Sequence, residues 1–164
     1  MRRLILMRHG QAERPKPGLE DFERAIDAEG AAEARQAGRR LAEAGMAPDL
    51  ALVSAATRTL QTWKAVSEAF GEVKTVEERD LYGASAASLV EAVRHAGEAA
   101  GAVMVVGHNP AIHQFAMLLA RRCEDSPMTH KLLRGFPTGA AAVFGMDGET
   151  APRMEALFLP GEAG

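Results

Sequence analysis

The chain has 164 residues, of which 47% are hydrophobic and 25% are charged, so residues 1–164 have the size and composition of a single domain with a substantial core. The 19 Lys and Arg are outnumbered by 22 Asp and Glu, and a net charge of −3 gives no electrostatic reason to expect a nucleic acid or an anionic membrane as partner. The one cysteine, Cys123, excludes an internal disulfide and disfavours a thiolate metal cluster. Together with the lack of a recognisable export signal, this predicts a cytoplasmic location.

The N-terminal part of the chain predicts a strand, a loop and a helix. Residues 4–7 are all apolar, as is typical of a strand that is buried on both faces of a parallel sheet. Residues 10–23 are rich in Pro, Gly and charge and predict a loop. Over residues 27–44 alanine and leucine recur at helical spacing, which predicts an amphipathic helix closed by Gly45.

The rest of the chain continues this alternation. Further strands are predicted over residues 50–53, 74–76, 102–107, 140–144 and 153–159, and further helices over 57–70, from Ser85 or Ser88 to about Ala99, and 110–121, with Asp147-Gly148 as a hairpin turn. Strands that alternate with helices indicate the α/β class. The pattern therefore predicts a three-layer α/β/α sandwich with a mostly parallel central sheet.

Polar residues leave the ends of three of these apolar strands. Because parallel sheets bind ligands beyond the carboxyl ends of their strands, we expect these side chains to converge in one crevice. They are Arg8-His9-Gly10, Ser54 with Arg58 one helical turn later, and His108-Asn109.

Two imidazoles and two guanidiniums in one crevice suit phosphoryl transfer. Arginine binds phosphate oxygens with bidentate, charge-assisted hydrogen bonds and keeps its charge at any working pH. Histidine acts as a nucleophile or proton carrier near neutral pH. Because the guanidiniums neutralise the charge on the transferring group, the chemistry needs no metal and no cofactor.

These three motifs, in this order and context, resemble the histidine phosphatase superfamily, also called the phosphoglycerate mutase-like family. Arg8-His9-Gly10 follows the first strand, Ser54 and Arg58 stand at the start of a helix, and Gly107-His108 follows a later strand. The stretch Asp21-Phe22-Glu23-Arg24 followed by Glu29-Gly30 is similar to the SixA branch of phosphohistidine phosphatases. The resemblance implies a phosphoglycerate mutase-like fold.

The resemblance also implies a role for each matching residue. His9 is expected to be the nucleophile that forms a phosphohistidine intermediate, Arg8 and Arg58 to bind the phosphoryl oxygens, and His108 to stabilise the transferring group. Gly10 is expected to let the backbone come close to the ligand.

Three further residues are secondary candidates. Arg24 and Asp21 match positions where SixA-like proteins place another cation and a carboxylate near the site. Asn109 is expected either to bind substrate or orient His108, or to cap the helix that begins at Pro110.

One departure from the family pattern bears on the substrate. Many members carry a glutamate general acid where this chain has the run Leu81-Tyr82-Gly83-Ala84-Ser85, and Tyr82 is expected to serve packing. An alkoxide leaving group benefits greatly from an acid, whereas phosphohistidine leaves as neutral imidazole. The missing acid therefore favours a phosphoramidate substrate, with Asp21 as the first alternative proton donor and Glu13, Glu20 and Asp80 as others.

The sequence thus predicts a metal-independent phosphatase that acts on phosphohistidine in proteins. One alternative is a phosphatase for small phosphate monoesters, such as sugar or nucleotide phosphates. Another is a non-catalytic regulatory module that binds phosphate-bearing partners, although the full set of Arg8, His9, Arg58 and His108 speaks against it. The other histidines and Cys123 are expected to be structural or idle.

Overall fold

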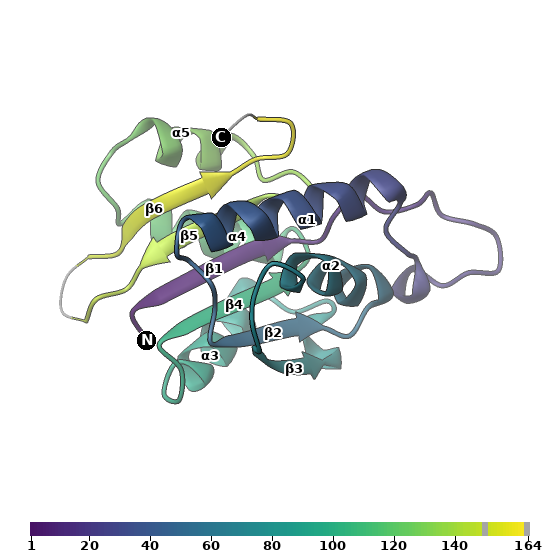
Figure 1. Ribbon diagram of the computed structural model, residues 1–164, viewed down its shortest axis with the longest axis horizontal. Coiled ribbons are helices and arrows are strands. Elements are labelled where there is room, and N and C mark those ends of the chain that lie inside the picture. The colour runs from purple at the N-terminus through teal and green to yellow at the C-terminus, as the bar shows by residue number, and fades with distance from the viewer. Residues whose placement is uncertain (149–150, 163–164) are drawn as a thin grey trace.

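Six strands form one mixed sheet in the computed structural model, which describes residues 1–148 and 151–162. The strand order is β3-β2-β4-β1-β5-β6 (Figure 1). Strands β1, β2, β3 and β4 pair in parallel, whereas β5 runs antiparallel to both β1 and β6. The bounds are β1 Arg3–Arg8, β2 Leu50–Ser54, β3 Lys74–Glu78, β4 Ala102–Gly107, β5 Ala141–Gly145 and β6 Arg153–Phe158.

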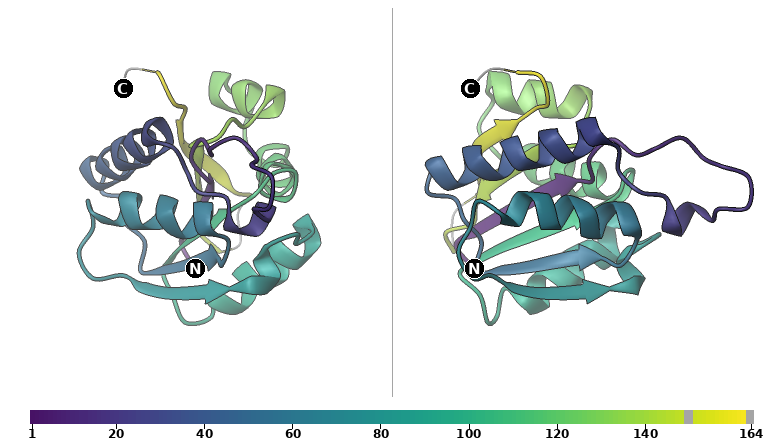
Figure 2. Two further views of the ribbon diagram at one scale, coloured as in Figure 1. Left: turned by 90° about the vertical axis from the view of Figure 1, so that its right-hand side faces the viewer. Right: turned by 45° about the vertical axis from the view of Figure 1, so that its right-hand side comes forward.

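Helices cover both faces of this sheet, which confirms the predicted three-layer sandwich. Helices α1 and α2 lie on one face, and α3, α4 and α5 lie on the other (Figure 2, left). The bounds are α1 Ala28–Glu43, α2 Thr57–Ser67, α3 Ala86–Ala96, α4 Ala111–Ala120 and α5 Pro127–Arg134. None of the helices in the described part of the chain is both long and apolar enough to cross a membrane.

Strand β1 shows how the sequence produces these layers. Successive side chains of a strand point to opposite faces, so Leu4 and Leu6 pack with α3, α4 and α5, while Ile5 and Met7 pack with α1 and α2. All four are completely buried. An unbroken apolar run is therefore what a central strand in a covered parallel sheet requires.

The predicted elements agree with the structure apart from their ends and one omission. Helix α2 ends at Ser67 rather than at residue 70, α3 ends at Ala96, and β3 extends to Glu78. Ser85 is the residue that caps α3, since its hydroxyl accepts from the backbone N–H of Ser88. Helix α5 was not predicted, and its hydroxyl capping box and short length explain why apolar spacing did not reveal it.

The parallel strands bring their carboxyl ends to one edge of the sheet. The loop after β1, residues 9–27, extends from this edge beyond the helices (Figure 1; Figure 2, right) and contains a short 3₁₀ helix, η1, over Asp21–Glu23. A second 3₁₀ helix, η2, follows β3 over Arg79–Leu81. Both loops thus reach the edge where the polar motifs were expected to meet.

Candidate active site

His9 lies directly beyond β1, and hydrogen bonds fix both its backbone and its side chain. Its backbone N–H donates to the carbonyl of Gly107 (3.0 Å), and its own carbonyl accepts from Gly139 N–H (2.8 Å). The side chain is 93% buried, and Nδ1 lies 2.7 Å from the carbonyl oxygen of Gly10. A carbonyl can only accept a hydrogen bond, so Nδ1 carries the ring proton and the lone pair of the neutral imidazole is on Nε2.

Gly10 is needed for a close packing contact with α1. A Cβ at this position would lie 2.7 Å from the carbonyl oxygen of Gly30, a separation that no side chain tolerates. The N–H of Gly10 donates to Thr62 Oγ1 (2.9 Å), and Thr62 in turn donates to the carbonyl of Arg58 (2.6 Å). Gly10 therefore lets the first turn of α1 lie against the His9 loop. Its expected role in bringing the backbone close to a ligand stays a prediction.

Arg58, in the first turn of α2, faces His9 with one edge of its guanidinium. Nε lies 3.4 Å from His9 Nε2, while the two terminal nitrogens donate to residue 21: one to the backbone oxygen of Asp21 (2.7 Å) and one to its carboxylate (2.9 Å). The Arg58 side chain is only 6% exposed. Asp21 therefore fixes the orientation in which Arg58 presents Nε to the imidazole.

Asp21 connects the long loop to the other side of the site. Arg24 donates to one carboxylate oxygen (2.8 Å), and the Tyr82 hydroxyl donates to the other (2.8 Å), which also accepts from Arg58. The hydrogen bonds from Arg24, followed by the one from Tyr82, hold the pKa of this carboxyl far below its usual value. Asp21 is ionised at neutral pH, so the structure argues against it as the proton donor.

The other proposed proton donors do not line the pocket beside His108. Glu13 pairs with Lys16 (3.2 Å), and Glu20 and Asp80 are exposed. Among the residues that line the pocket beside His108, Asp21 is the one carboxylic acid. The one carboxyl group that the described residues place in this pocket is therefore held ionised.

Arg8 and Asn109 both donate to the backbone carbonyl of Phe136, at 3.1 and 2.9 Å. The Nε of Arg8 is buried without a hydrogen-bond partner. Helix α4 begins at Ala111 with Pro110 at the N-cap position and no side-chain cap, so the expectation that Asn109 caps the helix is wrong. Its amide instead ties the end of β4 to the segment that precedes β5.

His108 follows β4 and lies beside His9, with ring centroids 5.3 Å apart. Its Nε2 is 2.8 Å from Ser54 Oγ, and its Nδ1 is buried without a partner. The Tyr82 ring meets the imidazole edge-on at 5.4 Å. Tyr82 packs as expected, yet it also belongs to the hydrogen-bond network of the site.

Burial and the neighbouring guanidiniums keep both imidazoles neutral. Burial, with a smaller contribution from Arg58, lowers the pKa of His9 to about 4 and that of His108 to about 3. Three guanidiniums, those of Arg8, Arg24 and Arg58, therefore surround two neutral imidazoles and one carboxylate. The resulting excess of positive charge suits an oxyanion such as a phosphoryl group.

A pocket of about 450 Å³ lies over this cluster, with Arg58, Tyr82, His108 and Asn109 in its walls. No group of three or more His, Cys, Asp or Glu in residues 1–148 and 151–162 is arranged to hold a metal ion. The cationic groups that the site offers to an anion are guanidiniums.

Three contributors to the site were missed in the sequence. The Phe136 carbonyl is a backbone group and leaves no signal in residue type. Thr62 follows Arg58 by one helical turn, which marks it as a neighbour but does not indicate its bond to Gly10. Tyr82 lies in the segment, residues 81–85, where many family members carry the glutamate. Its position in that segment is the one sequence signal that could have identified it as a site residue.

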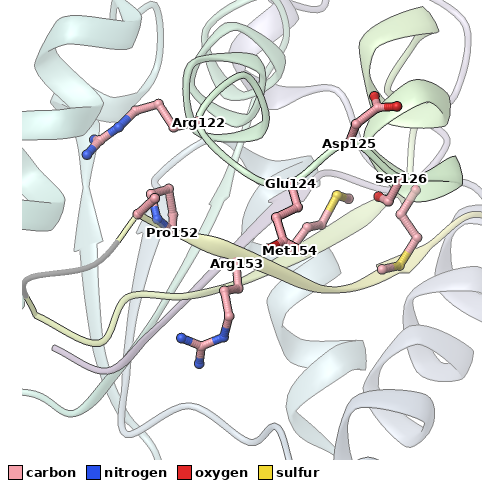
Figure 3. Close-up of a pocket in the computed structure, with 9 residues that line it drawn as sticks. Arg122, Glu124, Asp125, Ser126, Pro152, Arg153 and Met154 are labelled. Atoms are coloured by element: carbon pink, nitrogen blue, oxygen red, sulfur yellow. The ribbon is translucent and has the colours of Figure 1, made fainter.

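A second hollow, of about 510 Å³, lies between the segment that joins α4 to α5 and the start of β6 (Figure 3). The side chains of Arg122, Asp125 and Arg153 point in different directions there. None of the buried polar atoms that lack partners in the described residues belongs to this hollow. The strand-end cluster is therefore the candidate active site.

Comparison with known proteins identifies relatives of this chain. The model of the histidine phosphatase superfamily (branch 1) matches residues 4–82, which include His9, Asp21 and Arg58. The uncharacterized protein Rv1276c of Mycobacterium tuberculosis is 32% identical over 88% of this chain and 90% of its own length.

Solved structures extend the likeness to the whole fold. A SixA protein of Agrobacterium tumefaciens superposes with a TM-score of 0.84 and 30% identity, over 97% of this chain and 99% of its own. The protein histidine phosphatase SixA in complex with tungstate shares the fold, with a TM-score of 0.76 and 23% identity over 96% and 97% of the two chains. The chain therefore belongs to the histidine phosphatase superfamily.

Proposed function

We propose that this protein is a metal-independent phosphatase that removes phosphate from phosphohistidine in proteins, with His9 as the nucleophile. One observation carries the proposal: the neutral His9 imidazole lies among three guanidiniums. Its Nδ1–H donates to the carbonyl oxygen of Gly10, which leaves the lone pair on Nε2. This arrangement combines an available nucleophile with the positive charge that a phosphoryl group requires.

Unused hydrogen-bond donors support binding of an oxyanion. Arg8 Nε is buried without a partner, as is His108 Nδ1, which is a donor in the tautomer that carries its proton there, and a buried polar group without a partner costs about 1–3 kcal/mol. A phosphoryl group has acceptor oxygens that can satisfy such donors. We assign Arg8, Arg58 and His108 to the phosphoryl oxygens, with Arg24 and Asn109 as outer contacts to the substrate.

The proposed reaction runs in two displacements. His9 Nε2 attacks phosphorus and the N–P bond of the substrate breaks, so that a substrate imidazole with a proton on its other nitrogen leaves as neutral imidazole. Water then attacks phosphorus and the His9 N–P bond breaks. Both protons of the water stay on the product H₂PO₄⁻, and His9 returns to its neutral form. No step needs a separate acid.

Among the described residues, the pocket holds neither a protonated carboxyl group nor an imidazolium, which favours this substrate over an alkyl phosphate. Asp21 is held ionised by Arg24 and Tyr82, and both imidazoles are neutral. An alkoxide would have to leave without a proton from any of these groups, whereas imidazole is a neutral leaving group. A cytoplasmic location is part of the proposal, and the free thiol of Cys123 supports it.

Phosphate release tests the proposal directly. Purified protein in a metal-chelating buffer would be supplied with an N-phosphohistidine protein, and separately with an alkyl phosphate monoester. The His9→Ala variant would be compared with His95→Ala, which removes a histidine whose side chain is 86% exposed.

We expect rapid release from phosphohistidine by the wild type and by His95→Ala, a loss of at least about 1000-fold in His9→Ala, and slow turnover of the monoester. Efficient turnover of the monoester alone would assign the protein to the small-molecule phosphatases. Binding of both without turnover would indicate a phosphate-binding regulatory module.

A further inference from the structure

Ser54 lies at the end of β2 with no exposed surface, and its hydroxyl is 2.8 Å from His108 Nε2. We propose that Ser54 is a positioning residue, whose hydroxyl donates to Nε2 and thereby keeps the ring proton of His108 on Nδ1, where it meets the phosphoryl group. The inference rests on the proposed function, because that function supplies the phosphoryl ligand.

The hydrogen bond between Ser54 and His108 can run in either direction, and the two arrangements differ in which buried donor is left without a partner. Ser54 Oγ already accepts a long contact of 3.5 Å from Ala56 N–H, and His108 Nε2 is the one acceptor that the described contacts give to its proton. In the reverse arrangement, with Nε2–H donating to Oγ, the hydroxyl proton of Ser54 would be fully buried without an acceptor. Burying an unsatisfied donor is unfavourable, and the arrangement with Ser54 donating also leaves one in the free site, the Nδ1–H of His108. A phosphoryl oxygen can satisfy that donor, whereas the described contacts give a reversed Ser54 hydroxyl no acceptor.

The unpartnered nitrogen of His108 distinguishes the two arrangements. With its proton on Nε2, the ring would turn a lone pair on Nδ1 toward bound phosphate, where two electron-rich groups repel. With its proton on Nδ1, the ring offers a hydrogen-bond donor in a buried position that has none of its own partners in the protein. Only the second tautomer lets His108 stabilise the transferring group without being charged.

Hydrogen bonds to neighbouring elements fix the backbone of Ser54 and so the position of its hydroxyl. Its carbonyl accepts from the Thr59 hydroxyl (2.6 Å) at the start of α2, and the strand itself pairs with β3 up to residue 54. A rigid donor fixes the tautomer of a histidine in the way that outer groups do at metal sites. His108 is neutral in the free site, so the position of its single ring proton determines what it can donate.

Nuclear magnetic resonance can observe that proton without turnover. In ¹⁵N-histidine-labelled protein at pH 7, long-range ¹H–¹⁵N correlations distinguish a protonated from an unprotonated ring nitrogen. We expect His108 to carry its proton on Nδ1 in the wild type, and we expect this nitrogen to shift when inorganic phosphate is added.

Two variants test the cause. Ser54→Ala removes the donor, so His108 should move toward the Nε2–H tautomer, and kcat should fall by about 10- to 100-fold with little change in KM. Ser54→Thr keeps a hydroxyl and should restore both the Nδ1–H signal and most of kcat. Ser126→Ala, which removes the capping serine of α5, is the control: it lowers stability but should leave the His108 signals unchanged.

The proposal fails if wild-type His108 is protonated on Nε2, or if Ser54→Ala folds and leaves both the tautomer and kcat unchanged. It also fails if phosphate shifts the His9 signals without affecting His108. If His108 has the predicted tautomer and responds to phosphate while phosphohistidine is not hydrolysed, the proposed substrate is wrong but the role of Ser54 stands.

Discussion

Acidification should reveal how strongly the site suppresses protonation of His9. Burial and Arg58 lower the pKa of His9 from 6.5 to about 4. At pH 5 an ordinary histidine is only about 3% neutral, whereas one with the pKa of His9 is about 90% neutral. The nucleophile is therefore expected to stay available at a pH at which a solvated histidine would have lost about thirtyfold in activity.

The same shift predicts the direction in which stability changes with pH. The unfolded chain binds a proton at this histidine more readily than the folded chain, so the free energy of unfolding falls as the pH drops from 6.5 toward 4. For His9 the difference corresponds to roughly 3 kcal/mol, and His108, whose pKa is also lowered, adds a loss in the same direction. Below about pH 4 His9 contributes no further loss.

The assay is an NMR titration of the histidine rings in the folded protein, with His9→Ala to assign the signal and urea-unfolded protein as the reference. Free protein is used because a phosphohistidine substrate titrates in the same range. A His9 ring that titrates near 6.5 in the folded protein would refute the reasoning, since it would mean that burial and the guanidiniums do not disfavour the imidazolium.

Three further predictions address the network, the packing and the metal independence. Asp21→Asn should lower kcat/KM by about 10- to 100-fold, because Arg58 loses a charged hydrogen-bond partner. If Asp21 is not the acid, the pH profile of kcat/KM measured by steady-state kinetics should keep the same alkaline limb in the variant as in the wild type. Gly30→Ala should lower the free energy of unfolding in urea by about 3 kcal/mol, because its Cβ would lie 2.3 Å from the Gln11 carbonyl oxygen; at Gly71, where the space is open, Ala should be nearly neutral. Phosphate release should be unchanged after treatment with EDTA, and a loss restored by a divalent cation would contradict the charge argument.

Local chemistry explains why most of the fold could be predicted. Apolar runs such as residues 102–107 are fully buried in the centre of the sheet, and Gly45, with φ of +67°, closes α1 as its position suggested. Helix α5 was missed because it buries only Thr129 and Leu132. Its location depends on packing against α4 and β6, which no local pattern encodes.

The site could be predicted where it follows from topology. Parallel strands share one edge, so Arg8, His9 and His108 had to meet there. The role of Asp21 could not be predicted, because the path of the loop over residues 9–27 decides which cations its carboxylate reaches. The same holds for the contact of Ser54 with His108, which depends on the register of β2 and β4 and on a side-chain rotamer.

The central claim is that phosphate passes through His9, and trapping the phosphoenzyme tests it most directly. The protein would be mixed with an N-phosphohistidine substrate, quenched in alkali within milliseconds to preserve N–P bonds, digested and mapped by mass spectrometry. We predict a phosphorylated peptide with the phosphate on His9, formed and consumed at rates compatible with turnover. Turnover with no phosphorylated His9, or with the phosphate on another residue, would contradict the account.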